Sequence, residues 1–301
     1  MLRSMQQAWS EAWHQALYGP GGFFVRERPG DHFRTSVTAS RAYAGAVRTL
    51  AARVDEALGR PDPYDVVDLG AGRGELLHAL PDVPARWRLT AVEHAPDPGT
   101  GLRWRAQVPA LTGLLVANEW LDAVPLDVVE DGRLVLVDRD GTEHPGPPAP
   151  PDLLAWCARW WPAGRAEVGL ARDRAWAAAV GQVCHGLAVA VDYGHVLGGR
   201  RPTLTGYRAG RQVAPVPDGS CDLTAHVAVD SCAAATGARL LTQRDALGRL
   251  GLTGALPRWY GDPAAYAAGL QRASDTAELL DPAGLGGFAW LLQEVDAPPV
   301  L

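Results

Sequence analysis

Apolar and polar residues follow two different periods along the chain, and together they predict an α/β fold. Short apolar runs predict buried strands at Tyr64–Leu69, Arg88–Glu93, Leu114–Ala117, Leu187–Val191 and Phe288–Val295. Apolar residues at three-to-four spacing predict helices at Gln6–Leu17, Thr38–Leu58, Glu75–Leu80, Arg172–Cys184, Asp230–Thr236 and Pro263–Arg272. Strands that alternate with helices imply a mostly parallel sheet with helices on both faces.

The middle of the chain departs from this alternation. Asp131-Gly132, between apolar runs at Leu126–Glu130 and Arg133–Asp138, predicts a β-hairpin. The proline-rich stretch Gly141–Pro151 predicts a surface loop, and Asp230 is a candidate N-cap for the helix that it begins. We interpret three tryptophans on one expected helix as packing or as a partner surface: Trp156, Trp160 and Trp161.

Composition excludes several classes of protein. The chain has 301 residues, 47% of them hydrophobic, which is enough for a sizeable core. A net charge of −6 argues against a nucleic-acid-binding role, since phosphate contacts need clustered cations. Four scattered cysteines without a C-x-x-C pair favour reduced thiols and no metal site. With no signal-like N-terminus and no long apolar run, we expect a cytoplasmic protein without a membrane segment.

A glycine-rich turn after the first predicted strand is the main chemical signal. Asp68-Leu69 leads into three glycines at alternate positions, Gly70, Gly72 and Gly74. Glycine allows a tight turn and a close approach of the backbone to a ligand. The spacing is G-x-G-x-G, whereas a dinucleotide site has G-x-G-x-x-G, so a nicotinamide oxidoreductase is disfavoured. An acid beside the loop suits the ammonium and sulfonium groups of S-adenosylmethionine.

Two further strand ends place polar residues at the same predicted edge of the sheet. Glu93 ends the second strand, where a carboxylate can accept the two ribose hydroxyls of an adenosine. Asn118, the only asparagine of the chain, ends the third strand and precedes Glu119 and Asp122. The amide is a candidate cofactor ligand or, alternatively, a helix cap. The two acids are candidates to bind a cationic acceptor and to take a proton.

Six motifs in order resemble the MidA-like class I methyltransferases, which include the mitochondrial arginine methyltransferase of complex I assembly. The likeness spans nearly the whole chain. Besides the glycine loop, the matching segments are Ala16–Phe24, Asp31–Ser36, Asn118–Pro125, Ala190–Gly194 and Asp222–Val227. The resemblance implies a Rossmann-like methyltransferase fold, S-adenosylmethionine as cofactor and an arginine side chain of a protein as acceptor. Where the family has Pro-Glu after Thr-Ser, this chain has Val37-Thr38, so one carboxylate is missing.

These observations give one set of expectations. We expect a single domain over 1–301, with an N-terminal helical and lid segment (1–60), a cofactor-binding core (61–138) and insertions with the remaining sheet (139–301). Cofactor ligands are Asp68, Gly70, Gly72, Gly74, Glu93 and Asn118, and catalytic candidates are Glu119 and Asp122. Substrate or lid candidates are Asp31, Thr35, Ser36, Asp192, Tyr193 and His226.

Alternatives stay open for the lid, for the histidine and for the function. The segment Tyr18–Ser36 is a lid or a permanently packed loop, and His226 is a proton carrier or a structural residue. The rival functions are a small-molecule methyltransferase and a cofactor-binding assembly factor without turnover. We expect a protein substrate, no nucleic acid and no membrane; the sequence does not indicate an oligomeric state.

Overall fold

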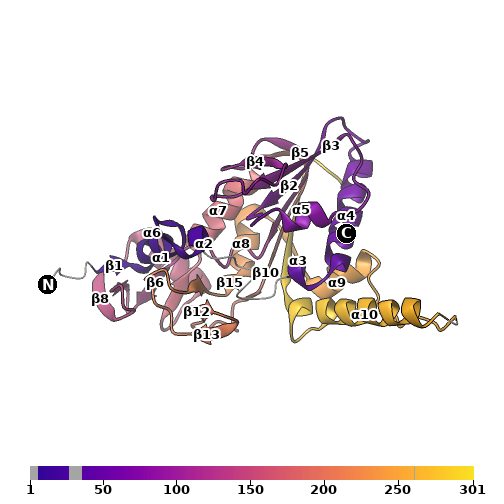
Figure 1. The fold of residues 1–301 in the computed structure, drawn as a ribbon. Coiled ribbons are helices and arrows are strands. Elements are labelled where there is room, and N and C mark those ends of the chain that lie inside the picture. The colour runs from indigo at the N-terminus through magenta and orange to yellow at the C-terminus, as the bar shows by residue number, and fades with distance from the viewer. Residues whose placement is uncertain (1–5, 27–35, 261) are drawn as a thin grey trace. The chain divides into compact units, whose positions relative to one another are not determined.

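The computed structural model describes residues 6–26, 36–260 and 262–301, which divide between two compact units (Figure 1). We call them the large-sheet unit and the small-sheet unit. The large-sheet unit takes residues 36–119, 179–193 and 238–301, and the small-sheet unit takes the N-terminal segment, 120–178 and 194–237. Each is described by itself. The single domain over 1–301 stays a prediction.

A seven-stranded sheet forms the centre of the large-sheet unit. Its strand order is β16-β17-β10-β5-β2-β3-β4, and every pairing is parallel except the two made by β17. The strands are β2 (Tyr64–Leu69), β3 (Trp87–Val92), β4 (Arg103–Arg105), β5 (Leu111–Asn118), β10 (Val183–Asp192), β16 (Arg239–Thr242) and β17 (Ala289–Val295). The expected mostly parallel sheet and mixed α/β class are confirmed.

Helices of the same unit pack on this sheet through one apolar cluster (Figure 1). Alternate residues of the strands face it, such as Val66 of β2 and Leu114 of β5, because strand side chains point to opposite faces in turn. The helices are α3 (Ser36–Ala39), α4 (Arg41–Ala57), α5 (Glu75–Ala79), α9 (Gln243–Arg249) and α10 (Pro263–Leu280), with a 3₁₀ turn at Leu285–Gly287. Ser40 separates α3 from α4 and caps α4 by accepting from the Ala42 amide.

The small-sheet unit contains short strands and four helices among its described residues. Its largest sheet combines β1 (Gln7–Ala8), β6 (Asp127–Glu130), β7 (Arg133–Val137), β8 (Glu143–Pro148) and β9 (Ala166–Val168). Two smaller sheets hold β11 (Gly194–His195), β12 (Thr205–Arg208), β13 (Arg211–Val213), β14 (Asp222–Thr224) and β15 (Val227–Ala228). The helices are α1 (Trp9–Tyr18), α2 (Phe23–Arg26), α6 (Pro151–Trp160) and α8 (Val229–Thr236), and α7 (Leu170–Val180) begins here. Trp156, Trp160 and Trp161 pack into its apolar cluster, as the packing interpretation predicted.

Three local predictions are wrong. The proline-rich stretch Gly141–Pro151 contains β8, which pairs with β7 along one side only, and an edge position tolerates prolines because it needs fewer backbone donors. Helix α7 ends at Val180 instead of Cys184, because β10 begins at Val183. Asp230 lies inside the first turn of α8 and accepts from the Leu197 amide instead of capping the helix.

The remaining findings concern the cysteines and the membrane. All four cysteines have free thiols; Cys221 and Cys232 are buried, Cys157 is half-buried and Cys184 is exposed. Among the residues that the structure describes, no helix is both long and apolar enough to span a bilayer.

Candidate functional site

Asp68 stands near the carboxyl end of β2 as a buried and unsatisfied acid. Its side chain is 4% exposed. Within the described part of the chain its carboxylate makes no hydrogen bond and no ion pair. Burial, reinforced by the nearby charges of Glu75 and then Glu93, raises the pKa of Asp68 to about 8. A buried acid without a partner is costly, which is typical of a position that a ligand completes.

The glycine loop that follows has backbone angles that favour glycine. Gly70, Gly72 and Gly74 have φ angles of 75°, 58° and 82°, in the left-handed region. A Cβ on Gly74 would come within 2.5 Å of the Leu102 side chain. The amides of Gly70 and Ala71 both donate to the Val92 carbonyl oxygen, at 2.9 and 3.2 Å, which joins the loop to the end of β3.

Two glutamate side chains accept hydrogen bonds from backbone amides of this loop. The Oε2 atom of Glu93 accepts from the Gly72 amide at 3.1 Å, and its Oε1 accepts from the His94 amide at 2.7 Å. Glu75 reaches back so that its Oε2 accepts from the Arg73 amide at 2.8 Å. The structure therefore brings together Asp68, the three glycines and Glu93, as the sequence predicted, and it adds Glu75. The sequence analysis missed Glu75 because a glutamate at a helix start has an ordinary explanation.

Asn118 and Glu119 form a second polar group in the large-sheet unit. The Tyr43 hydroxyl donates to Asn118 Oδ1 at 2.5 Å, and Asn118 Nδ2 donates to Glu119 Oε1 at 3.1 Å. The same Oε1 accepts from the Ser36 amide at 2.8 Å. Glu119 has a φ of 51°, an uncommon backbone conformation for this residue type that is typical of functional turns. Asn118 ends β5 and caps no helix, because the described chain after it forms turns.

Tyr43 was not predicted as part of this group. Burial, the charge of Glu119 and the charge of Asp68 together raise its pKa well above the ordinary value, so the phenol stays protonated and remains a donor. The tyrosine lies on α4, where its position within a helical pattern gives no sign of a polar role. Its contact fixes the side-chain amide of Asn118 with the nitrogen directed to Glu119.

Asp122 lies in the small-sheet unit and takes part in a buried network. Its Oδ2 accepts from the Thr224 hydroxyl at 2.8 Å, and its backbone oxygen accepts from Arg172 Nη2 at 2.5 Å. Arg172 is fully buried and also donates to the carbonyl oxygens of Val124, Ala225 and His226. The guanidinium thus ties together two segments that the sequence analysis had selected, Asn118–Pro125 and Asp222–Val227.

Two other titratable residues belong to this network. Burial raises the pKa of Asp222 well above its ordinary value, and the charge of Asp122 adds to the effect. Burial is the main cause that lowers the pKa of His226, so its imidazole is neutral near pH 7. The His226 amide donates to the Thr203 hydroxyl at 2.9 Å.

The other predicted residues lie at the end of β10 and in the segment that precedes α4. Asp192 is buried at the end of β10 and accepts from the Tyr193 amide, and the ring of Tyr193 lies 5.4 Å from that of Phe288. Ser36 is buried and its amide donates to Glu119. Asp31 and Thr35 lie outside the described residues, as does much of the segment Tyr18–Ser36. Phe23, which belongs to that segment, packs in the core of the small-sheet unit.

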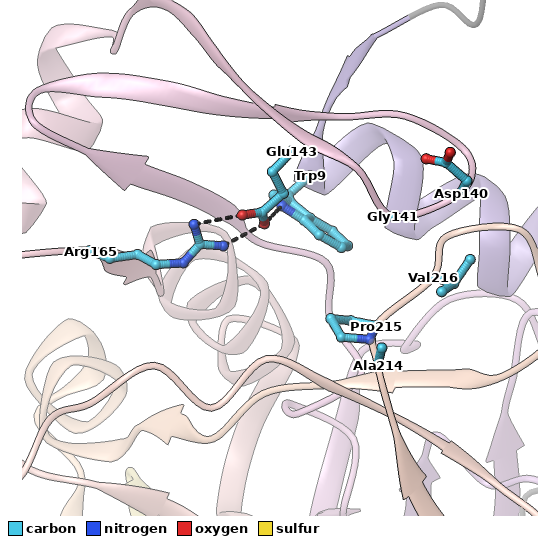
Figure 2. Close-up of a pocket in the computed structure, with 8 residues that line it drawn as sticks. All are labelled: Trp9, Asp140, Gly141, Glu143, Arg165, Ala214, Pro215 and Val216. Atoms are coloured by element: carbon cyan, nitrogen blue, oxygen red, sulfur yellow. Dashed lines mark hydrogen bonds and ion pairs between the residues drawn. The ribbon is translucent and has the colours of Figure 1, made fainter.

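A cavity of about 400 Å³ in the small-sheet unit is lined by none of these residues (Figure 2). Glu143 accepts from Trp9 Nε1 at 2.7 Å and pairs with both terminal nitrogens of Arg165, at 2.9 and 2.5 Å. Figure 2 shows this paired acid beside the indole, with Pro215 across the opening. Glu143 and Arg165 satisfy each other, and Asp140 accepts from the Thr142 amide, so we assign no ligand to this cavity.

Comparison with solved structures shows the same fold in two structures from Burkholderia thailandensis, both described as members of one superfamily. The first is described as a "likely methyl transferase" bound to S-adenosyl-homocysteine; it has a TM-score of 0.78 and 23% identity, over 98% of this chain and 89% of that one. The second is the native structure of an uncharacterized protein, with a TM-score of 0.79 and 23% identity, over 98% and 88% of the two chains. No match was found among curated proteins.

A match to a family model shows which protein family the chain belongs to, which a similar fold alone does not show. The model is described as "Putative S-adenosyl-L-methionine-dependent methyltransferase" and matches residues 79–244, more than half of the chain. Its description agrees with the cofactor class that the glycine loop and Asp68 predicted. The chain therefore belongs to this family of S-adenosyl-L-methionine-dependent methyltransferases.

Proposed function

We propose that the chain binds S-adenosylmethionine at the loop 68–75 and transfers its methyl group to a nitrogen of an arginine side chain on a protein. The observation on which this rests most is Asp68, a carboxylate that is 4% exposed and has no cation of the described chain beside it. A ligand with an ammonium group satisfies that carboxylate, whereas a ligand with phosphates would be repelled by Asp68, Glu75 and Glu93. The homologous fold crystallised with S-adenosyl-homocysteine supports the same choice of ligand.

The residues at the loop fit the parts of this cofactor. The glycines leave the backbone open to close approach, and Glu93 offers two acceptor oxygens for ribose hydroxyls. When bound, the cofactor supplies an activated methyl group, so the protein has to orient the reactants and manage one proton. Aligning two bound reactants lowers the barrier by about 7–11 kcal/mol.

Glu119 is our candidate for the acceptor side. Its carboxylate is held through Oε1 by the Asn118 side-chain amide and the Ser36 backbone amide, which fixes the position of an acid that can pair with a guanidinium. Such a carboxylate holds the guanidinium by charge-assisted hydrogen bonds and accepts the proton that the methylated nitrogen loses. For Asp122, the hydrogen bond from Thr224 favours a positioning role over a direct role in proton transfer.

The cofactor assignment is tested by calorimetry with S-adenosyl-homocysteine. Wild-type protein should bind it, and Gly72→Val should lose binding without unfolding, because a branched side chain strains a φ of 58° and fills the loop. Gly132→Val is the matched control, since Gly132 also has a positive φ, of 73°, but lies in the hairpin of the small-sheet unit. Retained binding by Gly72→Val contradicts the assignment.

The acceptor is tested with methyl-labelled cofactor and cell extract, followed by mass spectrometry of labelled proteins. Label on arginine that depends on Glu119 supports the proposal. Label found only in small molecules indicates the small-molecule methyltransferase. Binding without any label, together with a cellular role that survives Glu119→Ala, indicates an assembly factor without turnover.

A further inference from the structure

Glu75 adds a third carboxylate to the cofactor loop. Its side chain is exposed, yet it turns back over the loop, where Oε2 accepts from the Arg73 amide at 2.8 Å. The same oxygen lies 3.1 Å from the position that a Cβ on Gly72 would occupy. The carboxylate is thus hydrogen-bonded to the loop backbone although its side chain is exposed.

Acidic side chains outnumber basic ones at the loop. Asp68, Glu75 and Glu93 lie close enough for the two glutamates to raise the pKa of Asp68, with Glu75 the larger of the two. Tyr43 faces Asp68 from α4 as a neutral phenol, and Glu119 adds a further negative charge near that phenol. Arg73 is the cation of the loop itself, and its side chain is exposed. Within the described chain none of the three loop acids forms an ion pair.

The charge of the cofactor changes during methyl transfer. The bond between sulfur and methyl carbon breaks as the bond to the acceptor nitrogen forms, and that nitrogen then loses a proton. S-adenosylmethionine is a sulfonium cation, whereas S-adenosyl-homocysteine is a neutral thioether at the same sulfur. The two molecules otherwise share their adenosine, ammonium and carboxylate groups. A negative loop consequently distinguishes them by one unit of charge.

We propose that Glu75 is a specificity-determining residue that makes this site prefer the sulfonium substrate over the thioether product. The inference rests on the proposed function. Because Glu75 is exposed and its charge is screened by water, it changes the preference for S-adenosylmethionine over S-adenosyl-homocysteine only by a modest factor. Such a preference mainly limits inhibition by the product.

The test is the ratio of the dissociation constants of S-adenosyl-homocysteine and S-adenosylmethionine, measured by calorimetry at low salt. Glu75→Gln should lower this ratio by about threefold, since exposed charge pairs have effects of this size. The glutamine keeps an acceptor for the Arg73 amide, so the loop hydrogen bond is preserved. Raising the salt concentration should shrink the difference between wild type and variant.

Glu56→Gln is the matched control. Glu56 is an exposed glutamate of α4 in the same unit, and its replacement changes the net charge by the same amount. The ratio should not change in this variant. An unchanged ratio in Glu75→Gln, with both ligands bound and the melting temperature retained, overturns the inference and leaves the proposed function intact. Failure of the wild type to bind either ligand overturns the proposed function itself.

Discussion

Two aspartates on the same strand show how the two ends of the large sheet differ. Asp65, near the start of β2, and Asp68, near its end, are both 4% exposed. Asp65 pairs with the Nε and Nη2 atoms of Arg88, at 2.5 and 2.7 Å, and accepts from the Thr112 amide. Asp68 has neither kind of partner in the described chain. One buried acid is therefore satisfied by the fold, and the other is left for a ligand.

The difference has a topological reason. In a parallel sheet the carboxyl ends of the strands lie along one edge, and the loops that follow them bind ligands. At the opposite edge, the Asp55 carboxylate is likewise satisfied by Arg86 and by the Trp87 indole nitrogen. Ion pairs satisfy Asp55 and Asp65 at the amino end of the sheet, whereas Asp68 at the carboxyl end has no such partner in the described chain.

The largest effect should come from Asp68→Asn. Removing the negative charge should weaken binding of S-adenosylmethionine by about 100-fold, because a charge-assisted contact with an ammonium group is lost. Calorimetry measures the affinity. Asp152→Asn, an exposed acid of the small-sheet unit, serves as the control. Affinity that is unchanged in Asp68→Asn would mean that the acid does not face the cofactor.

The same variant should be more stable than the wild type without ligand, and the gain should depend on pH. The pKa of Asp68 is about 8 in the folded chain and lower in the unfolded chain, so the folded state binds more protons between about pH 4 and 8. Stability of the wild type therefore falls across this window and levels off above it. The advantage of Asp68→Asn should be largest above pH 8 in thermal melts.

Asp65→Asn should lose stability and keep its affinity for the cofactor. Breaking the pair with Arg88 leaves a guanidinium without its acid, and we expect a loss of about 2 kcal/mol in the free energy of unfolding. Cofactor affinity should remain within about twofold of wild type, since the residue lies at the other end of β2. Urea unfolding and calorimetry measure the two quantities. If the loss in binding free energy exceeded the loss in free energy of unfolding, the proposal that the amino end of β2 serves stability and its carboxyl end serves binding would be contradicted.

The affinity for the cofactor should also depend on pH through the ionisation of Asp68. A cationic cofactor prefers the ionised form of Asp68, so a proton must leave when the pH is below the pKa of about 8. Affinity for S-adenosylmethionine should rise by about tenfold from pH 6 to pH 7 and level off above pH 8. Titration in buffers with different ionisation enthalpies should detect the released proton at pH 7. Asp68→Asn should abolish both effects, and a flat profile in the wild type would show that Asp68 is already ionised.

The smallest expected effect belongs to Tyr43→Phe. This change removes the donor to Asn118 Oδ1 and should weaken cofactor binding or stability by about 1 kcal/mol, the usual size of one hydrogen bond. Tyr266→Phe is the control, since Tyr266 lies on α10 and its ring packs against Trp259. If Tyr43→Phe behaves like the control, the phenol does not orient the amide of Asn118.

The sequence predicted some parts of this arrangement more fully than others. Asp68, the three glycines and Glu93 could be selected because strand, turn and acid follow one another within a short stretch of chain. Tyr43 could not be selected, because its partner Asn118 lies 75 positions away and helical spacing gives no sign of the contact. The hydrogen bond from Thr224 to Asp122 likewise joins positions 102 apart. Catalytic roles for Glu119 and Asp122 stay predictions.

Local patterns in the sequence were enough to predict the α/β class, the strand that leads into a glycine turn, and the acids near the loop. These features depend on local periodicity and on the backbone freedom of glycine, which can be read within a few residues. Which acids are neutralised depends on tertiary contacts, which local patterns do not reveal. Asp65 and Asp68 are equally buried on one strand, but Arg88 lies directly opposite Asp65 on the neighbouring strand β3 and pairs only with it. Pairing between distant segments is a property of the folded chain, and it leaves Asp68 without a partner at the cofactor loop.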